Sequence, residues 1–156
     1  MGSAIIIEQE DPRRADVDRL ITALNAYDEA LYPPEANYHL TADQLYSPDI
    51  IFLVARQKDE AVGMIGLWLR REWELGEVKR MFVSPSARGQ GLAPRLLARI
   101  EQIAREHKLS QLMLETGPRS IEALKVYERA GFTRRGPFAD YPEGPFSVFM
   151  EKTLAG

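Results

Sequence analysis

The sequence predicts an α/β fold of the mixed (α+β) kind, with a mostly antiparallel central sheet of about seven strands and about four helices. Strand-like runs and segments with helical spacing follow one another in the order strand, helix, helix, three strands, helix, strand, helix, two strands. One helical segment separates two strands by a connection long enough for a right-handed crossover. Those two strands are therefore expected to be parallel neighbours.

The first part of the chain is predicted to hold a strand and two helices. Alternation of side-chain type gives the strand at Ala4 to Glu8. Apolar residues recur at helical spacing from Val17 to Leu31, and Pro33-Pro34 ends that helix. Thr41 is suited to cap a short helix that runs to Tyr46.

Three strands in a row are predicted next. They cover Ile50 to Arg56, Ala61 to Leu69 and Gly76 to Val83, and short polar or charged stretches link them. Strands joined by such short links form an antiparallel meander.

After Pro85 the pattern changes to alternating helices and strands. Apolar residues from Leu96 to Ala104 share one helical stripe, which extends to His107. The elements predicted after this helix are a strand at Gln111 to Thr116, a helix at Ile121 to Ala130 closed by Gly131, and strands at Phe132 to Arg135 and Phe146 to Thr153.

Composition indicates one soluble domain over residues 1–156. The chain is 45% hydrophobic and 28% charged, contains no cysteine, and has no apolar run near the ~20 residues that a membrane helix needs. Its first residues lack the features of a signal peptide, so we expect a cytoplasmic protein without disulfides. A net charge of −3 argues against a general nucleic-acid binder. The two histidines, His39 and His107, indicate no metal site.

A glycine-rich stretch, "RGQGLA" at residues 88–93, lies between a predicted strand and a predicted helix. Backbone N–H groups at a helix start have no intrahelical partner, and the helix dipole adds positive potential there. Gly89 and Gly91 remove the Cβ atoms that would keep a diphosphate away from the backbone. The stretch therefore predicts a phosphate site, and the alternative is a turn that merely joins strand to helix.

Two motifs resemble those of a known superfamily. The pattern Arg88-x-x-Gly91-x-Ala93, preceded by "VKRMFVSP" and followed by two leucines, resembles the acetyl-CoA-binding motif of the GNAT superfamily of acyl-CoA-dependent N-acetyltransferases. "SIEALKVYERAGF" at 120–132 is similar to the second signature of that superfamily, with Ser120 where the family usually has Asn. Ser120 is still able to cap the helix. The resemblance covers about Ile50 to Lys152 and implies a GNAT-like fold.

The resemblance also implies where acetyl-CoA binds. The pantetheine arm of the cosubstrate is expected between two splayed strands, Glu77 to Val83 and Gln111 to Thr116, and the N–H groups of the glycine-rich stretch are expected to hold the diphosphate. The residues expected at the cosubstrate are Met81, Phe82, Val83, Arg88, Gly89, Gln90, Gly91, Leu92, Ala93, Ser120 and Tyr127. The alternative for Met81 and Val83 is that they are ordinary strand residues, whose backbone groups pair only within the sheet.

Glu77 is the residue expected to act as general base, because several GNAT enzymes keep a catalytic glutamate at this strand position. The alternative is an exposed strand glutamate that pairs with Lys79 or Arg80. Strand alternation predicts that Glu77, Lys79, Met81 and Val83 share one face of the sheet.

Tyr127 matches the tyrosine that protonates the departing CoA thiolate in the family, and a phenol near pKa 10 is able to do so. The alternative is a core position beside Ala123 and Leu124.

The predicted function is transfer of an acetyl group from acetyl-CoA directly to a primary amine of a small, amino-acid-like molecule. Without cysteine there is no acyl-cysteine intermediate. The alternatives are acetylation of a protein lysine or N-terminus, and a non-catalytic acyl-CoA sensor. Homodimerisation is left open, and no membrane partner is expected. The aromatic residues considered as lining of an acceptor cleft are Tyr32, Tyr38, Trp68, Trp73 and Tyr141. The arginines considered as partners of a substrate carboxylate are Arg70, Arg71, Arg80 and Arg119.

Overall fold

A seven-stranded sheet forms the centre of the protein. The computed structural model describes residues 4–154. Within them the strand order is β1-β2-β3-β4-β5-β7-β6, and β4 and β5 are the only parallel neighbours. The strands are β1 Ile5–Gln9, β2 Ile50–Gln57, β3 Glu60–Arg70, β4 Leu75–Val83, β5 Gln111–Thr116, β6 Thr133–Arg135 and β7 Val148–Thr153.

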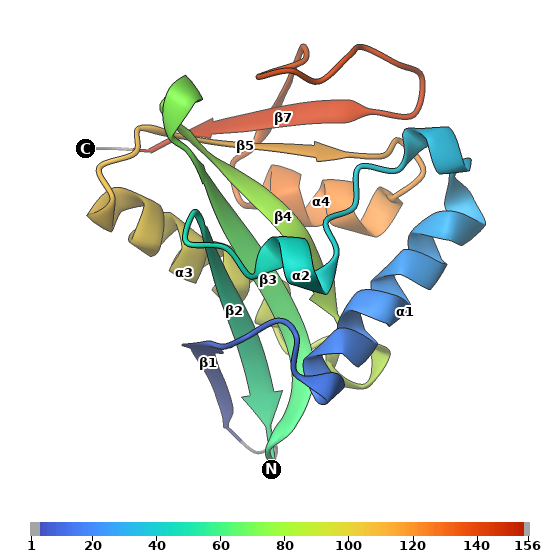
Figure 1. Cartoon of the computed structure of the whole chain (residues 1–156), viewed down its shortest axis with the longest axis vertical. Helices are drawn as coiled ribbons and strands as arrows, with labels where there is room; N and C mark the ends of the chain where they lie inside the picture. The colour runs from blue at the N-terminus through green and yellow to red at the C-terminus, as the bar shows by residue number, and fades with distance from the viewer. Residues whose placement is uncertain (1–3, 155–156) are drawn as a thin grey trace.

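Helices cover both faces of the sheet (Figure 1). They are α1 Ala15–Leu31, α2 Ala42–Leu45, α3 Leu92–Glu106 and α4 Ile121–Arg129. The first two pack on one face through a cluster that includes Val17 and Leu45, and the last two pack on the other face through Leu96 and Leu124. The predicted fold class is confirmed, as is the parallel pair on either side of the α3 crossover. The last strand begins at Val148, two residues later than predicted.

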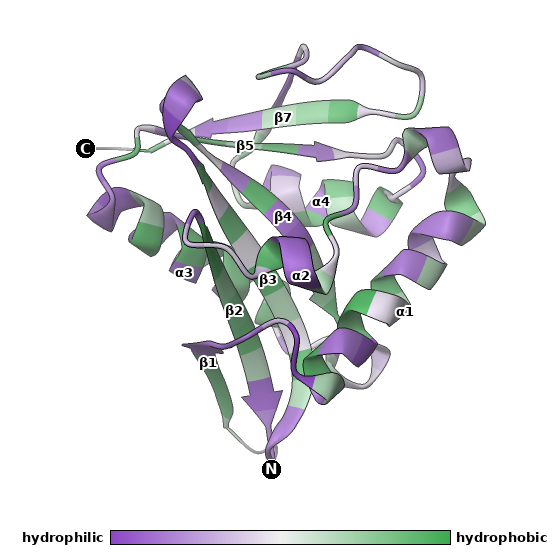
Figure 2. Cartoon of the chain, viewed as in Figure 1, coloured by the Kyte–Doolittle hydropathy of each residue, from purple (hydrophilic) through white to green (hydrophobic). Residues whose placement is uncertain are grey.

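Hydropathy follows this layered arrangement. Hydrophobic residues run along the strands in Figure 2, whereas the short α2 is mostly hydrophilic.

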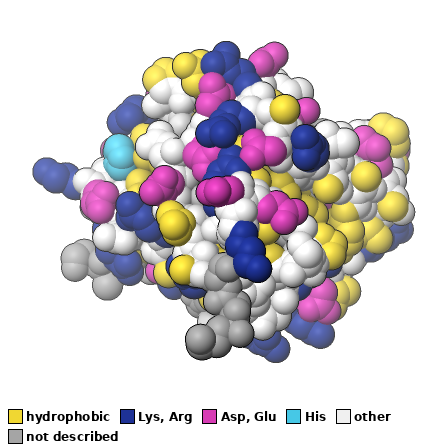
Figure 3. All heavy atoms as spheres, turned by 90° about the horizontal axis from the view of Figure 1, so that it is seen from below, with side chains coloured by type: hydrophobic (Ala, Val, Ile, Leu, Met, Phe, Trp, Pro, Cys, Tyr) yellow, Lys and Arg dark blue, Asp and Glu magenta, His cyan; other side chains and the backbone are white. Residues whose placement is uncertain are grey.

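Thr41 caps α2 as predicted, because its hydroxyl accepts the N–H of Gln44 while the Gln44 side chain accepts the N–H of Thr41. Acidic and basic side chains are intermixed on the face that Figure 3 shows. Within the described part of the chain, no helix has the length and apolar character to cross a membrane.

A β-bulge interrupts β4 at Arg80. Gly66 pairs with Lys79 and Met64 with Phe82, so Arg80 and Met81 together face the single residue Ile65 of β3. Arg80 has a φ of 56°, which is the left-handed region that few residues other than glycine adopt. The bulge changes the alternation of side chains along the strand.

The prediction that Glu77, Lys79, Met81 and Val83 share one face is therefore wrong. Glu77 and Lys79 do lie together, with Lys79 Nζ 3.5 Å from Glu77 Oε2. Met81 and Val83 pack instead against the core on the α3 and α4 side, and Phe82 packs with the α1 core. The extra residue of the bulge reverses the alternation that the sequence suggested.

β4 leaves its parallel neighbour soon after it starts. The two strands pair only at Gly76 with Leu112 and at Glu77 with Met113, whereas β5 continues to Thr116 alongside β7. Gly76 permits this close start: a Cβ there would lie 2.8 Å from Leu67 Cδ1 and 3.0 Å from Leu109 Cδ1. The second half of β4 is thus splayed from β5.

A Gly76→Ala substitution is expected to lower the free energy of unfolding by about 1–3 kcal/mol, because the added methyl overpacks the point where β3, β4 and β5 meet. Gly136→Ala is the control, since its Cβ would meet no atom within 4 Å. Urea unfolding of both variants checks this. Equal midpoints for the two variants would contradict the close approach at Gly76.

Candidate functional site

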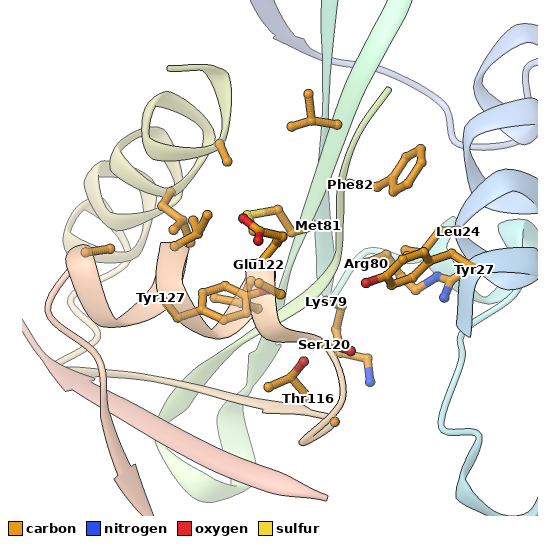
Figure 4. A pocket seen from close by; sticks show the side chains of 18 of the residues that line it. Leu24, Tyr27, Lys79, Arg80, Met81, Phe82, Thr116, Ser120, Glu122 and Tyr127 are labelled. Atoms are coloured by element: carbon orange, nitrogen blue, oxygen red, sulfur yellow. The ribbon is translucent and has the colours of Figure 1, made fainter. Parts of the chain in front are cut away.

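One cavity of about 890 Å³ joins the splayed end of β4 to both helix layers. Its walls come from β4, the glycine-rich stretch, the β5–α4 turn, α4, the end of α1 and the segment before β7. In Figure 4, Met81 points toward the side of α4 and Tyr127, whereas Phe82 and Arg80 point toward α1. The bulge therefore presents two different sets of side chains to the two halves of one cavity.

The glycine-rich stretch ends this cavity on the side of α3. Gly89 and Gly91 have φ values of 82° and 72°, in the left-handed region that suits glycine. The helix begins at Leu92, and within residues 4–154 the N–H groups of Gly89 to Ala93 have no hydrogen-bond acceptor. A Cβ on either glycine would meet nothing within 4 Å, and Gly89, Gly91, Leu92 and Ala93 all line the cavity. Such a cradle suits an anionic group.

Most residues expected at the cosubstrate line the cavity. These are Met81, Phe82, Val83, Arg88, Gly89, Gly91, Leu92, Ala93, Ser120 and Tyr127. Gln90 is not among them: its side chain donates to the carbonyl of Ala87 and accepts a hydrogen bond from Gln57. Arg88 donates from Nε to the carbonyl of Val83 at 3.1 Å, which holds its side chain beside the end of β4.

Comparison with known proteins agrees with this geometry. The model of the acetyltransferase (GNAT) family matches residues 17–132. An "IAA acetyltransferase" of Azospirillum brasilense is 45% identical over 150 residues, which cover 96% of this chain and 98% of that protein. The chain belongs to the GNAT family of acetyltransferases.

One solved structure supports the family assignment of this GNAT protein, and a second shows the same fold. A Klebsiella pneumoniae protein assigned to the acyl-CoA N-acyltransferases is 36% identical, with a TM-score of 0.81 and coverage of 97% of this chain and 98% of that one. The fold is also shared with the PaiA N-acetyltransferase of Thermoplasma acidophilum, solved in complex with coenzyme A, at a TM-score of 0.72 and 17% identity, covering 96% of this chain and 99% of that one. The GNAT acetyltransferases use acetyl-CoA and an acceptor.

Ser120 does not cap α4 in this GNAT protein, so that expectation is wrong. No hydrogen bond joins its side chain to the N–H groups of the first turn. Its hydroxyl instead lies 2.8 Å from the hydroxyl of Tyr32, which reaches it from the end of α1. The Ser120 hydroxyl therefore contacts Tyr32, which is far away in the sequence, and not the backbone of its own helix.

Tyr127 lies on α4 with its ring against Phe132 and only 7% of its surface exposed. Within the described residues its hydroxyl has no hydrogen-bond partner, and the residue lines the cavity. Burial raises the pKa of this phenol above its usual value, and Asp28 and Glu115 add to the effect. The side chain is thus both a core residue and a protonated hydroxyl at the cavity wall.

Glu77 is fully buried and does not line the cavity. Arg70 Nη1 donates to Oε1 at 2.6 Å, and the Tyr141 hydroxyl donates to Oε2 at 2.5 Å. Lys79 lies on the same carboxylate at 3.5 Å. The alternative of an exposed glutamate is therefore wrong, although the predicted pairing with Lys79 is present.

The structure brings a second carboxylate, Glu115 of β5, to the cavity wall. Burial raises the pKa of Glu115 to about 7, with Ser147 and Lys79 opposing the shift. Sequence reasoning missed this residue because the strand was predicted without regard to which of its side chains face the cavity. The signal that could have found it is a charged side chain inside "QLMLET".

The opposite half of the cavity, here called the acceptor half, is lined by Tyr32, Tyr38, His39, Asp28, Lys79, Arg80 and Phe146. Of the aromatic candidates, Tyr32 and Tyr38 line it, whereas Trp68, Trp73 and Tyr141 do not. Of the arginine candidates, only Arg80 is part of the wall.

Arg80 is incompletely paired although it is buried. Its Nη2 donates to the carbonyl of Ile21 at 3.3 Å and to the side chain of Asn25, and its Nη1 lies 3.9 Å from Asp28. The Nε has no partner within the described residues. Burial lowers the pKa of Arg80 to about 10, with Asp28 opposing the shift. The guanidinium is therefore a desolvated cation next to the acceptor half.

A Glu77→Gln substitution is expected to lower the free energy of unfolding by about 3 kcal/mol, because Arg70 and Lys79 would lose the charge that compensates their burial. Glu72→Gln is the matched control, since Glu72 contacts the same Arg70 but is mostly exposed. The control is expected to cost less than about 1 kcal/mol. Chemical unfolding at pH 7 measures both, and similar losses would contradict the buried role of Glu77.

Proposed function

We propose that this protein transfers the acetyl group of acetyl-CoA directly to a primary amine of a small, amino-acid-like molecule. The observation that carries the proposal is one continuous cavity, which has the amide cradle of Gly89 to Ala93 at one end and the polar acceptor half at the other. A cavity of this kind lets both substrates meet without a covalent enzyme intermediate. The absence of cysteine from the sequence agrees with direct transfer.

The proposal that acetyl-CoA binds at this end of the cavity rests on the second half of β4 and the start of α3. The residues after the bulge have no β5 partner, so an extended pantetheine arm has strand edge available to it. The amides of Gly89 to Ala93 and the positive end of α3 suit the diphosphate. A thioester carbonyl near the splayed strand would meet backbone donors able to stabilise an oxyanion.

The acceptor end favours a compact molecule that carries an anionic group beside its amine. The α1–α2 connection and the segment before β7 meet over this end, with the Tyr38 and Tyr141 rings 5.2 Å apart and those of Tyr32 and Phe146 6.4 Å apart. A folded protein chain has little room between segments in such contact. The partly paired Arg80 suits a carboxylate, because a buried cation gains from a second anion.

The geometry favours Glu115 over Glu77 as the general base. Glu77 has no exposed surface and three polar partners, whereas Glu115 lines the cavity with a pKa of about 7. A carboxylate with that pKa is half ionised at neutral pH and is able to accept the proton that an attacking amine loses. We therefore assign Glu77 to holding Arg70 and Lys79 in place.

Atoms balance in the proposed reaction. The neutral amine nitrogen attacks the thioester carbonyl carbon, a C–N bond forms and the C–S bond breaks. Glu115 receives the proton that the amine loses. The departing thiolate receives a proton from Tyr127, whose hydroxyl has no competing partner within residues 4–154. The Tyr127 phenolate then takes a proton from solvent and Glu115 returns its proton to solvent, which restores both groups for the next turnover.

A screen of amines with acetyl-CoA, read out as release of free thiol, tests the function. Free amino acids and other small amines that carry a carboxylate are expected to give turnover well above amines without one. Peptides that offer a lysine or an N-terminus are expected to be poorer. Preferred acetylation of the peptides would favour a protein acetyltransferase, and binding of acetyl-CoA without thiol release would favour a sensor.

Replacing Glu115 with Gln is expected to lower kcat/KM by about 10²-fold, as loss of a general base does. Below pH 7 the Glu115 carboxyl is protonated and unable to accept a proton, so wild-type activity is expected to rise with pH through about 7. The variant should lose this rise. Glu122→Gln, at an exposed lining position on α4, is the control. An unchanged pH profile in Glu115→Gln would remove Glu115 as the base.

A further inference from the structure

Tyr32 crosses from the acceptor side of the molecule to the start of α4. The helix α1 ends at Leu31, and Tyr32 takes an extended conformation with φ −132° and ψ 150°. Pro33 and Pro34 follow, and their missing N–H groups prevent the helix from continuing. The side chain of Tyr32 is thereby directed to the β5–α4 turn, 88 positions later in the chain at Ser120.

The Tyr32 ring fills the space above Gly117. A Cβ at position 117 would lie 2.1 Å from the Cζ and the hydroxyl oxygen of Tyr32, closer than any real contact. Gly117 does not have a φ in the left-handed region, so its backbone would accept alanine. The requirement for glycine here therefore comes from the ring and not from the backbone.

The hydroxyl of Tyr32 fixes the ring in this position. It accepts the backbone N–H of Arg119 at 2.9 Å and lies 2.8 Å from the Ser120 hydroxyl. Both partners are at the start of α4, which also carries Tyr127. The contact thus joins the acceptor side to the helix of the proposed acid.

Two further contacts join the same segments. Arg119 donates from Nη1 to the carbonyl of Leu31 at 2.5 Å, and its guanidinium lies 5.3 Å from the centre of the Phe146 ring. The Tyr32 ring meets Phe146 edge-on. Three chain segments therefore converge on Tyr32: the end of α1, the β5–α4 turn and the segment before β7.

We propose that the Tyr32 ring is a specificity-determining wall of the acceptor half, which admits compact amines and excludes those with a bulky extension. This inference rests on the proposed transfer to a small amine. Tyr32, Gly117, Ser120 and Phe146 all line the cavity, so an acceptor that extends toward them meets the ring. Removing the ring lengthens the cavity without removing Glu115 or Tyr127.

The test measures kcat/KM for acetylation across the twenty L-amino acids and a tripeptide with a free N-terminus. Tyr32→Ala is expected to raise kcat/KM for large side chains relative to small ones by at least about 10-fold, as expected when a pocket gains this much apolar space. Tyr46→Ala is the matched control, because Tyr46 is exposed and does not line the cavity. A ratio is used because partial unfolding would lower every rate equally.

Gly117→Ala probes the same wall from the other side. In the wild-type background the added methyl must displace the ring, so the large-to-small ratio is expected to shift by at least about fivefold. In the Tyr32→Ala background the methyl has space, and the shift is expected to be less than about twofold. Tyr32→Phe, which keeps the ring and loses the hydroxyl, is expected to keep the wild-type preference for small acceptors.

Each outcome supports or overturns the inference. An unchanged ratio in Tyr32→Ala, or an equal effect of Gly117→Ala in both backgrounds, overturns it while the proposed function stands. A wild-type enzyme that prefers large acceptors does the same. If Tyr32→Ala does not fold, Gly117→Ala in the wild-type background still decides, because an unchanged ratio in that variant overturns the inference. A wild-type protein that acetylates nothing in the panel overturns the proposed function, and the inference falls with it.

Discussion

The insertion of one extra residue into β4 at Arg80 is the constraint on which the site depends. β4 pairs with both β3 and β5 up to Glu77, and from Val78 onward, through the bulge, it pairs with β3 alone. A bulge bends its strand and increases the local twist, which agrees with the divergence from β5. The same insertion puts Arg80 on the α1 side together with Lys79 and turns Met81 to the α4 side. The bulge thus lies in the splayed part of β4 and gives the two sides of the gap different chemistry.

Buried, paired charges lie at the closed end of this gap, where β4 and β5 still pair. Glu77 lies at the last residue pair between β4 and β5, and it is held by Arg70, Lys79 and Tyr141. Such a group of charges is costly to bury and is stable only when every member is paired. The cluster also joins the β6–β7 connection to the sheet through Tyr141. The closed end is therefore held by paired charges, whereas the open end faces the cavity that both substrates would share.

Local patterns in the sequence were sufficient to predict the helices and strands and to place the glycine-rich stretch between a strand and a helix. Helical spacing, prolines and the Thr41 capping box each involve residues that are close together in the sequence, so they are visible without knowledge of the fold. The bulge left no such signal, because Arg80 adopts a left-handed φ without being glycine. The Tyr32 contact with Ser120 joins residues 88 positions apart. Only the folded chain brings them together, and for the same reason the burial of Glu77 and the exposure of Glu115 to the cavity were not foreseen.

Hydrogen–deuterium exchange with and without acetyl-CoA tests the central claim most directly. The account predicts that saturating acetyl-CoA slows exchange in peptides that cover Met81 to Val83 and Gly89 to Ala93, because the ligand would pair with the free edge of β4 and with the unpaired amides of the helix start. Peptides from β1 and β2 should keep their rates. Unchanged exchange at both segments with millimolar acetyl-CoA would contradict the claim that the splayed strand and the glycine-rich stretch bind the cosubstrate.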